Sequence, residues 1–309
     1  MAIGGGHGLN RSLRALTHAV DHVTAVVTAA DDGGSSGRLR RTMGVVPPGD
    51  LRMALAALSP RAELVELLQF RFDDEAAELA GHSLGNLIIV AAASLSGGDL
   101  VAGLDRVATT LGCRGRVLPC SLEPLHLHAT VDGSDITGQV RVTQSQRVER
   151  VWIEPAAPEP CPSAIRAIER ADLVVLGPGS LYTSLIPNLL VPGIADAVRA
   201  RTGPTVLVAN IREQPGETEG MELEDHLDAL RQHVPDLPLT AVIAHEGPAP
   251  ANFGRALKAD PAVVAAFGAD TVTADLLDGR DGHDPIKLAG VLGRVLRGGR
   301  SEAGGRGHP

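Results

Sequence analysis

The sequence predicts an α/β fold, in which a mostly parallel sheet carries helices on both faces and a smaller antiparallel unit is inserted. Short continuous apolar runs such as DLVVLG and TVLVAN alternate with longer amphipathic segments along most of the chain. Continuous apolar strands separated by helices are typical of a parallel sheet that is buried on both faces. After Gly112, several consecutive segments instead alternate polar and apolar residues with a period of two, which indicates antiparallel strands. Together these patterns predict a Rossmann-like domain with an antiparallel insertion.

The elements expected in the first third of the chain alternate between strand and helix. They comprise a strand over residues 1–3, a helix over 10–20, a strand over 22–28, a helix over 50–58 and a helix over 83–96. The helix over 10–20 places its leucines on one face, and Asp50 can cap the helix that begins with it. The run LIIVAAASL from Leu87 falls short of the ~20 residues of a membrane span, so we interpret it as a buried helix.

The period-two segments are RVLPCS, LHLHATVDG, ITGQVRVTQS and RVERVWIEP. The sequence VDGSD between two of them is a hairpin signal, because Asp-Gly favours the tight turns that join antiparallel strands. We therefore expect the antiparallel insertion to occupy residues from about 115 to 155.

The alternation of helix and strand resumes after the insertion. The expected elements are a helix over 162–170, a strand over 172–180, a helix from 194, a strand over 205–211, a helix from 225, a strand over 239–247 and a helix over 285–296. The sequence shows no internal repeat and no linker, so we predict a single domain over 1–297. The Gly- and Arg-rich residues 298–309 predict a disordered tail.

Composition excludes several classes of function. The net charge is -9, the pI is about 5.6 and only 2% of the residues are aromatic, which argues against a nucleic-acid partner. Cys113, Cys120 and Cys161 lack C-x-x-C spacing, so they predict buried thiols in a reducing compartment rather than a zinc site or disulfides. With no signal peptide and no membrane-spanning run, the expected location is the cytoplasm.

Three glycine-rich loops follow predicted strands, and ligands bind beyond the carboxyl ends of the strands of open parallel sheets. The first loop is GGGHG, residues 4–8, at the start of a helix. Its glycines let the backbone approach a phosphate, and the helix start supplies N–H donors and a positive dipole. A purely conformational turn is the alternative for this loop.

The second loop, residues 31–37, begins with two acids and continues GGSSG. A Rossmann acid that contacts a ribose hydroxyl would fall near this place, which is the argument for a nicotinamide cofactor. One acid would suffice for that contact, whereas two acids followed by GGSSG can hold a sugar, a phosphate or a magnesium-bound ligand. The alternative is that Asp31 and Asp32 only cap a turn.

The third loop, GPGSLYTSLIPN from Gly177, again leads from a predicted buried strand into a helix. Tyr182 can stack on a ligand ring or close the core, and Asn188 can bond a ligand or cap a turn. A fourth motif, GHSLGN at 81–86, looks like a nucleophile elbow, but it opens a helix after a charged segment. We therefore interpret Ser83 as an N-cap rather than a nucleophile.

Six motifs in chain order resemble the YvcK-type gluconeogenesis factor family: IGGGHGL, TAADDGGSSGRLR, PPGDLRMALAALS, GHSLGNL, LGPGSLYTSLIPNLLVPGI and QPGETEG. That family is related to the 2-phospho-L-lactate transferase CofD, and the resemblance covers nearly the whole chain. It implies a Rossmann-like fold, a cytoplasmic location, and a role in cell shape and peptidoglycan synthesis during gluconeogenic growth. It also implies binding of UDP-sugars such as UDP-N-acetylglucosamine. The related transferases move a phospholactyl group from a guanosine diphosphate carrier to a deazaflavin, with magnesium.

The resemblance implies that the three loops share one nucleotide-diphosphate cleft. The residues inside the matching motifs are Gly4, Gly5, Gly6, Gly8, Asp31, Asp32, Gly33, Gly34, Ser35, Ser36, Asn86, Gly179, Ser180, Tyr182 and Asn188. Two positions depart from the family pattern. His7 stands where the family commonly has Thr, and Gly282 stands where it has a basic residue, so that a contact there is either missing or made by Arg280.

Three functions follow from these observations. The favoured one is a regulator that binds a nucleotide sugar without turning it over, with regulatory protein partners and a homodimeric state as further expectations. The second is a magnesium-dependent transferase that acts on a nucleotide-diphospho substrate. The third is an NAD-binding oxidoreductase, against which the doubled acid argues. No catalytic or metal-binding residue is assigned; Mg²⁺ is the cofactor expected for the transferase, and NAD the one expected for the oxidoreductase.

Overall fold

The computed structural model describes residues 1–248, 254–280 and 282–303. Its centre is a sheet of seven strands in the order β10-β9-β8-β7-β1-β2-β3, and every strand pairing in it is parallel. The strands are β1 (Ala2–Gly4), β2 (Val23–Val27), β3 (Gly115–Pro119), β7 (Val174–Leu176), β8 (Thr205–Val208), β9 (Ala241–His245) and β10 (Asp270–Ala274). The central strands β1, β7, β8 and β9 are buried along their whole length. The predicted fold class is therefore confirmed.

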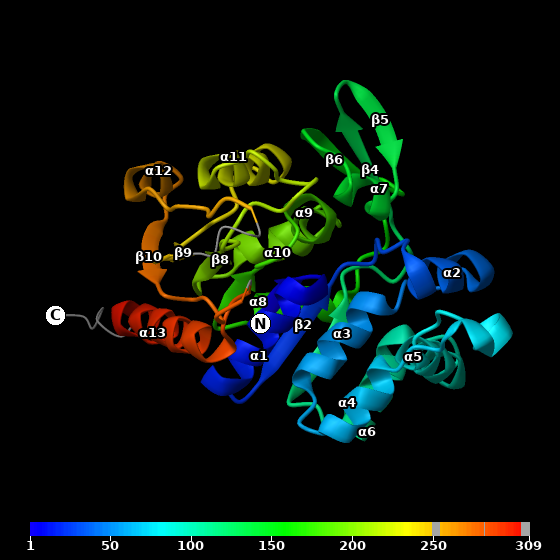
Figure 1. Cartoon of the computed structure of the whole chain (residues 1–309). Helices are drawn as coiled ribbons and strands as arrows, with labels where there is room; N and C mark the ends of the chain where they lie inside the picture. The colour runs from blue at the N-terminus through cyan, green and yellow to red at the C-terminus, as the bar shows by residue number, and fades with distance from the viewer. Residues whose placement is uncertain (249–253, 281, 304–309) are drawn as a thin grey trace.

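Helices cover both faces of this sheet (Figure 1). They are α1 (Gly6–Ala19), α2 (Gly34–Met43), α3 (Gly49–Leu58), α4 (Ala62–Gln69), α5 (Leu84–Leu95), α6 (Leu100–Leu111), α8 (Pro162–Glu169), α9 (Ile186–Leu189), α10 (Ile194–Ala200), α11 (Leu223–His233), α12 (Pro261–Ala266) and α13 (Pro285–Ala303), with a 3₁₀ turn η1 (Asp74–Leu79) and a π-helical turn η2 (Leu181–Leu185). α1 packs between α13 and α3, whereas α8 and α10 pack together.

None of the described helices is by itself long and apolar enough to cross a membrane. One pair bent by 70°, Leu181–Leu189 with Ile194–Ala200, meets the length and composition criteria jointly.

The strand order contains a topological switch point between β1 and β7. From β1 the chain moves outward through β2 to β3, and from β7 it moves the opposite way through β8 and β9 to β10. Because parallel crossovers are right-handed, the helices of the two halves lie on opposite faces, and a crevice opens where the direction reverses. The loops that follow β1 and β7 meet at this crevice.

The antiparallel insertion is a separate small sheet in the order β5-β4-β6, with β4 at His126–Val131, β5 at Ser134–Thr137 and β6 at Val148–Glu154. It projects from the body of the molecule beside α2 (Figure 1). Residues 115–119 were expected to belong to it, but they form β3 and pair in parallel with β2. β3 is an edge strand in which Arg116 is exposed and Val117, Leu118 and Pro119 are all buried, so its burial does not alternate. The expected strand ITGQVRVTQS ends at Thr137 and continues as the short helix α7 (Gln139–Thr143).

Two further expectations differ from the structure. The run LIIVAAASL forms much of α5, but this helix is not buried on all sides, since Ile88 is 38% and Leu95 is 74% exposed. The expected disordered tail began at 298, whereas α13 continues through Ala303. Residues 304–309 of that tail lie outside the described residues.

The first and third glycine-rich loops pack backbone against backbone at the switch point. A Cβ atom at Gly8 would lie 2.2 Å from the carbonyl oxygen of Pro178 and 2.5 Å from the Cα of Gly179. Ser12, one turn further along α1, donates a hydrogen bond of 2.6 Å to the carbonyl of Gly177. Only glycine at position 8 allows α1 to start this close to the end of β7.

Gly8→Ala is therefore expected to destabilise the protein by about 3 kcal/mol or more, because neither backbone atom can move without displacing a core element. Gly290→Ala in α13 is the control, since a Cβ there meets no atom within 4 Å. That change should be neutral or stabilise the helix by about 0.5–1 kcal/mol. Urea unfolding of both variants measures the difference, and equal midpoints would contradict the packing argument.

Candidate functional site

Two cavities lie on either side of the first turn of α1, at the switch point. The larger cavity measures about 1010 Å³ and the smaller about 460 Å³. Both are lined by His7, Gly8, Gly179 and Gln214, so they meet at the start of α1. The larger cavity is further lined by Asn10, Arg11, Arg14, Pro178, Asn210, Ile211, Arg212, Glu213, Pro215, Gly254, Gly282, His283 and Pro285. The smaller cavity is further lined by Gly5, Gly6, Asp50, Gln139, Val140, Thr143, Gln144, Ser180, Thr183 and Ser184.

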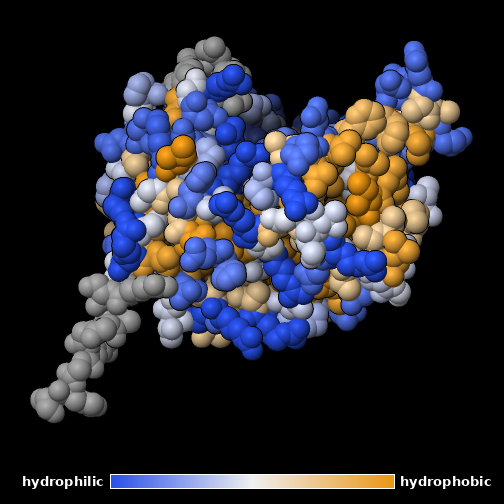
Figure 2. Space-filling view, turned by 90° about the horizontal axis from the view of Figure 1, so that it is seen from below, coloured by the Kyte–Doolittle hydropathy of each residue, from blue (hydrophilic) through white to orange (hydrophobic). Residues whose placement is uncertain are grey.

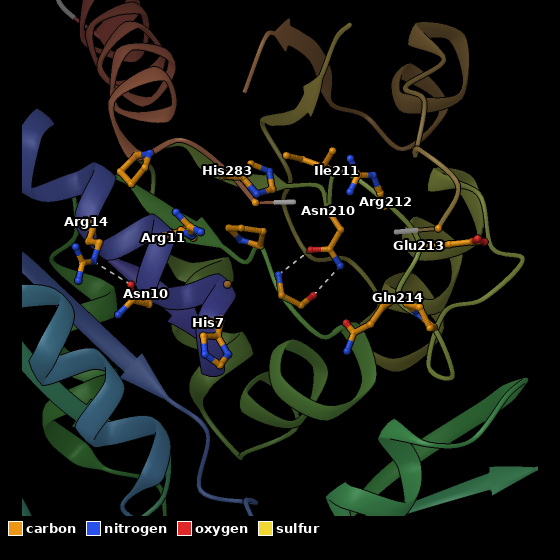
Figure 3. Close-up of a pocket in the computed structure, with 17 residues that line it drawn as sticks. His7, Asn10, Arg11, Arg14, Asn210, Ile211, Arg212, Glu213, Gln214 and His283 are labelled. Carbon is orange, nitrogen blue, oxygen red and sulfur yellow. Dashed lines mark hydrogen bonds between the residues drawn. The ribbon is translucent and has the colours of Figure 1, made fainter. Parts of the chain in front are cut away.

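The larger cavity is rich in cations. Arg11 and Arg14 approach it from α1, and the buried Arg212 approaches from the loop after β8 (Figure 3). Arg11 is held by an ion pair of 2.9 Å with Asp278. Burial lowers the pKa of His283 to about 4, so this side chain is neutral at pH 7. Such a lining favours a ligand that carries negative charge.

Arg11 occupies the space beside Gly282. A Cβ at position 282 would lie 3.0–3.3 Å from the guanidinium of Arg11. The sequence raised the question of which residue compensates for a missing basic side chain at 282, and it suggested Arg280. In the structure, Arg11 is the cation that lies against this glycine and lines the cavity.

The smaller cavity is polar but almost uncharged. Three glutamines line it, together with hydroxyl groups from the third loop and from α7. Its single charged lining residue among those described is Asp50, at the start of α3, which accepts a hydrogen bond from the backbone N–H of Gly6. Burial, with the nearby charge of Asp31, raises the pKa of Asp50 to about 7. Amides and hydroxyls around one carboxyl group suit a ligand with many hydroxyls.

The two acids of the second loop have different partners. Asp31 points inward, accepting hydrogen bonds from Gly33 N–H at 2.9 Å and from Ser36, and burial raises its pKa. Asp32 lies against the insertion, where its Oδ1 accepts a hydrogen bond of 3.0 Å from Val140 N–H in the first turn of α7. Because α7 lines the smaller cavity, Asp32 positions one wall of that cavity without lining it.

The serines of the second loop belong to a buried polar network beside the cavities. Asn86 donates to Ser35 Oγ at 3.0 Å and accepts from Arg52 Nε at 2.9 Å. Ser35 also lies 3.0 Å from Nδ1 of His82, whose pKa is lowered by burial. Neither described cavity is lined by Ser35, Ser36 or Asn86. In this geometry these residues fix the start of α2 against α3 and α5.

The third loop is divided between the site and the core. Gly179 and Ser180 line the cavities, whereas Tyr182 is 4% exposed. Asn188 is fully buried, and its amide donates to the carbonyls of Gly4 and Ser184 at 3.0 and 2.7 Å. Both side chains therefore lie in the core, and neither lines one of the two cavities.

A buried glutamate occupies the start of η2. Glu217 accepts hydrogen bonds from the N–H groups of Tyr182 and Thr183 at 2.7 and 3.1 Å, and burial raises its pKa. These amides are therefore already paired. The first turn of α1 likewise has leading amides without an intrahelical acceptor, and one of them, Gly6 N–H, donates to Asp50.

Of the predicted site residues, the structure brings together Gly5, Gly6, Gly8, Gly179 and Ser180 around the two cavities. Gly4 lies in β1, and Gly33 and Gly34 start α2 beside the acids. Sequence reasoning missed Arg11, Arg14, Asp50 and the α7 glutamine. The motif PPGDLR held the signal for Asp50, which we had interpreted only as a helix cap. Within the described residues no group of three or more His, Cys, Asp or Glu side chains is arranged to hold a metal ion.

Comparison with known proteins identifies relatives over nearly the whole chain. The profile of the CofD family, described as 2-phospho-L-lactate transferase, matches residues 1–277. The chain is 45% identical over 309 residues to a putative gluconeogenesis factor of Mycobacterium tuberculosis, covering 96% of this chain and 89% of that protein. It is 38% identical over 308 residues to the gluconeogenesis factor of Bacillus subtilis, covering 95% and 96%. A crystal structure from Bacillus halodurans superimposes with a TM-score of 0.87 at 36% identity, covering 94% of this chain and 97% of that chain.

The raised pKa of Asp50 makes stability depend on pH. The pKa rises from 3.8 to about 7 on folding, so between these pH values the folded protein holds a proton that the unfolded chain has lost. The free energy of unfolding must therefore fall as pH rises from about 4 to about 7. Asp50→Asn removes this titration while keeping an acceptor for Gly6 N–H. It should be about 4 kcal/mol more stable than the parent protein at pH 8, because a shift of about 3 pKa units corresponds to about 4 kcal/mol, and closer to it at pH 5.

Calorimetric melting at pH 5 and pH 8 measures this difference. Asp21→Asn, in an exposed loop, is the control, and its melting temperature should follow that of the parent protein at both pH values. A parallel pH dependence for Asp50→Asn and the parent would show that Asp50 is ionised freely in the fold.

Proposed function

Because the chain belongs to the gluconeogenesis factors of the CofD family, we propose that it is a regulator that binds a UDP-sugar across its two cavities. The ligand is of the UDP-N-acetylglucosamine type and is held without turnover. The bound state reports nucleotide-sugar supply in the cytoplasm to partners that control peptidoglycan synthesis and cell shape during gluconeogenic growth.

The observation that carries this proposal is the chemical difference between two cavities that meet at one helix start. A diphosphate at the junction would receive N–H groups and the positive end of the α1 dipole. The cationic larger cavity, with Arg14 and Arg212, suits the nucleotide half. The smaller cavity, lined by glutamine side chains and hydroxyls, suits the sugar half. Both volumes lie in or near the range of about 300–1,000 Å³ usual for small-ligand sites.

The lining of the cavities gives no support to a flat aromatic acceptor. No Phe, Tyr or Trp is among the described lining residues of either cavity. A flat acceptor such as a deazaflavin would gain little stacking there. A nicotinamide cofactor gains no support either, because Asp31 is turned toward Asp50 and lines neither cavity.

One observation favours a second candidate, a magnesium-dependent transferase on a nucleotide-diphospho substrate. Asp31 and Asp50 are two enclosed carboxyl groups, the charge of Asp31 raises the pKa of Asp50, and a Cβ at Gly49 would lie 2.6 Å from Asp31 Oδ2. Mg²⁺ is commonly held by one or two carboxylates together with substrate phosphates, so these residues fit the ion. Bound there, Mg²⁺ would neutralise developing charge on a phosphoryl group.

Titration calorimetry with UDP and UDP-N-acetylglucosamine tests the division between the cavities. Arg14→Ala should weaken both ligands about tenfold, since it removes one charge-assisted contact. Gln144→Ala, in the smaller cavity, should weaken only the sugar nucleotide, by about 3- to 10-fold. Gln146→Ala is the matched control, because Gln146 bonds to Glu219 outside the cavity. Tighter binding of NAD than of UDP-sugar, with hydride transfer, would overturn the proposal.

A separate experiment distinguishes the regulator from the transferase. The parent protein is incubated with UDP-N-acetylglucosamine or a guanosine diphosphate conjugate, with and without Mg²⁺, and the nucleotides are separated by chromatography. We expect the ligand to be recovered unchanged. Release of nucleotide that requires Mg²⁺ and is lost in Asp50→Asn, with binding retained, would replace the regulator by the transferase.

A further inference from the structure

The motif QPGETEG, residues 214–220, forms a tight turn between β8 and α11. Gln214 N–H donates a hydrogen bond of 2.9 Å to Thr218 Oγ1, and Thr218 N–H donates one of 2.9 Å to the carbonyl of Gln214. Gly216 has a φ of +84°, and a Cβ there would lie 2.6 Å from the carbonyl oxygen of Thr143 in α7. The turn is therefore closed on itself and packed against the helix that borders the smaller cavity.

Glu217, inside this turn, supports three residues that line the smaller cavity. Its Oε2 accepts hydrogen bonds of 3.3 Å from Gln214 Nε2 and of 3.3 Å from Thr183 Oγ1. The hydroxyl of Ser180 is a further donor to the carboxylate, and it lies 2.8 Å from Gln214 Nε2. Glu217 itself is 1% exposed and does not line the cavity. One buried side chain thus fixes the direction of several polar groups that a ligand in this cavity would meet.

The partners of Glu217 indicate that it carries a negative charge. Each of its described partners is a donor, since the N–H groups of Tyr182 and Thr183 join the side chains above. Burial raises the pKa of Glu217, but these hydrogen bonds lower it, and they suit an ionised carboxylate, which can only accept. Within the described residues, Glu217 forms no ion pair with a Lys, Arg or His. Its charge is therefore balanced by neutral donors and acts on whatever enters the adjacent cavity.

The lining of the smaller cavity favours selection by hydrogen bonds and charge rather than by apolar contact. Val140 supplies the one aliphatic side chain in its described lining, and that lining contains no Lys or Arg. A broad hydrophobic area lies on the right-hand side of Figure 2, where α4, α5 and α6 lie, but these helices line neither cavity. An anionic group in the smaller cavity would therefore meet the carboxyl groups of Asp50 and Glu217 without an Arg or Lys to offset them.

We infer that Glu217 makes this site specific for nucleotide sugars whose sugar is uncharged, and that it excludes sugars that carry a carboxylate or a phosphate. The inference rests on the proposed function, in which the sugar half enters the smaller cavity. Glu217 acts as a positioning residue that orients Gln214, Ser180 and Thr183 for the hydroxyl groups of a sugar. It also places a fixed negative charge behind them. A repulsive element of this kind discriminates between ligands that differ by a single group.

UDP-glucose and UDP-glucuronic acid test the inference, because they differ only in that a hydroxymethyl group of the sugar is a carboxylate in the acid. Two like charges on the order of 10 Å apart, at an effective dielectric constant of about 20, correspond to a change in affinity of about tenfold. In titration calorimetry the full chain should therefore bind UDP-glucose about tenfold or more tightly than UDP-glucuronic acid. UDP alone is the reference for the nucleotide half. This comparison uses the parent protein and needs no variant.

Two variants separate the charge of Glu217 from its positioning role. Glu217→Gln removes the charge and should reduce the preference for UDP-glucose to about threefold or less, with the affinity for UDP unchanged within about twofold. A purely structural loss would instead weaken all three ligands by a similar factor. Glu217→Asp keeps the charge but withdraws the carboxylate by one methylene, so it should keep the preference while weakening UDP-glucose by about 3- to 10-fold. Glu219→Gln, exposed in the same turn and bonded to Gln146, is the matched control for net charge and should behave as the parent does with every ligand.

Circular-dichroism melting establishes that each variant is folded before it is titrated. A parent chain that binds UDP-glucuronic acid as tightly as UDP-glucose would overturn the inference and leave the proposed function standing. So would a preference that folded Glu217→Gln leaves unchanged or, where that variant does not fold, a preference that Glu217→Asp abolishes. Failure of UDP and of both sugar nucleotides to bind the parent would instead overturn the proposed function, and this inference with it.

Discussion

The close approach of Gly8 to the carbonyl of Pro178 is the contact on which the arrangement of the site depends. It brings the start of α1 against the end of β7 with no side chain between them. Ser12 and Asn188 add hydrogen bonds across the same junction, to Gly177 and Gly4. The junction separates the crevice at the switch point into two cavities and leaves the leading amides of α1 between them. A wider separation would merge the cavities and remove the distinction between their linings.

The two adjacent acids of the second loop, Asp31 and Asp32, have different structural roles. Asp31 contributes charge beneath the smaller cavity, next to Asp50, while Asp32 secures α7 as a wall of that cavity. The following serines bind Asn86 and, through it, Arg52. The loop therefore couples the electrostatics of the site to the position of the insertion. A single acid in a tight turn would do only one of these.

The sequence predicted the parallel sheet well, because continuous apolar runs such as Val174–Leu176 occur where both faces are covered. It misassigned β3, because this strand comes directly before the alternating segments of the insertion and its exposed Arg116 looks like the start of the same pattern, although Val117, Leu118 and Pro119 are all buried. It also missed that one side of α5 is exposed to solvent, because an apolar stripe has the same sequence pattern whether or not a neighbouring element covers it. For the site, local motifs located the glycine loops. Arg11 and the glutamine of α7 could not be found that way, because their relevance arises only when distant segments meet.

Glu217 makes the backbone donors on the two sides of the cleft unequal. At the start of η2, the buried Glu217 already accepts hydrogen bonds from the N–H groups of Tyr182 and Thr183. Under the proposed function, an unsymmetrical ligand with a base at one end and a sugar at the other would meet the amides at the start of α1, with cations on one flank and amide side chains on the other. The chemistry of the two flanks would favour one orientation. A regulator of this kind would distinguish the two ends of its ligand as well as its charge, because a buried carboxyl group of the chain, Glu217, occupies the alternative donors.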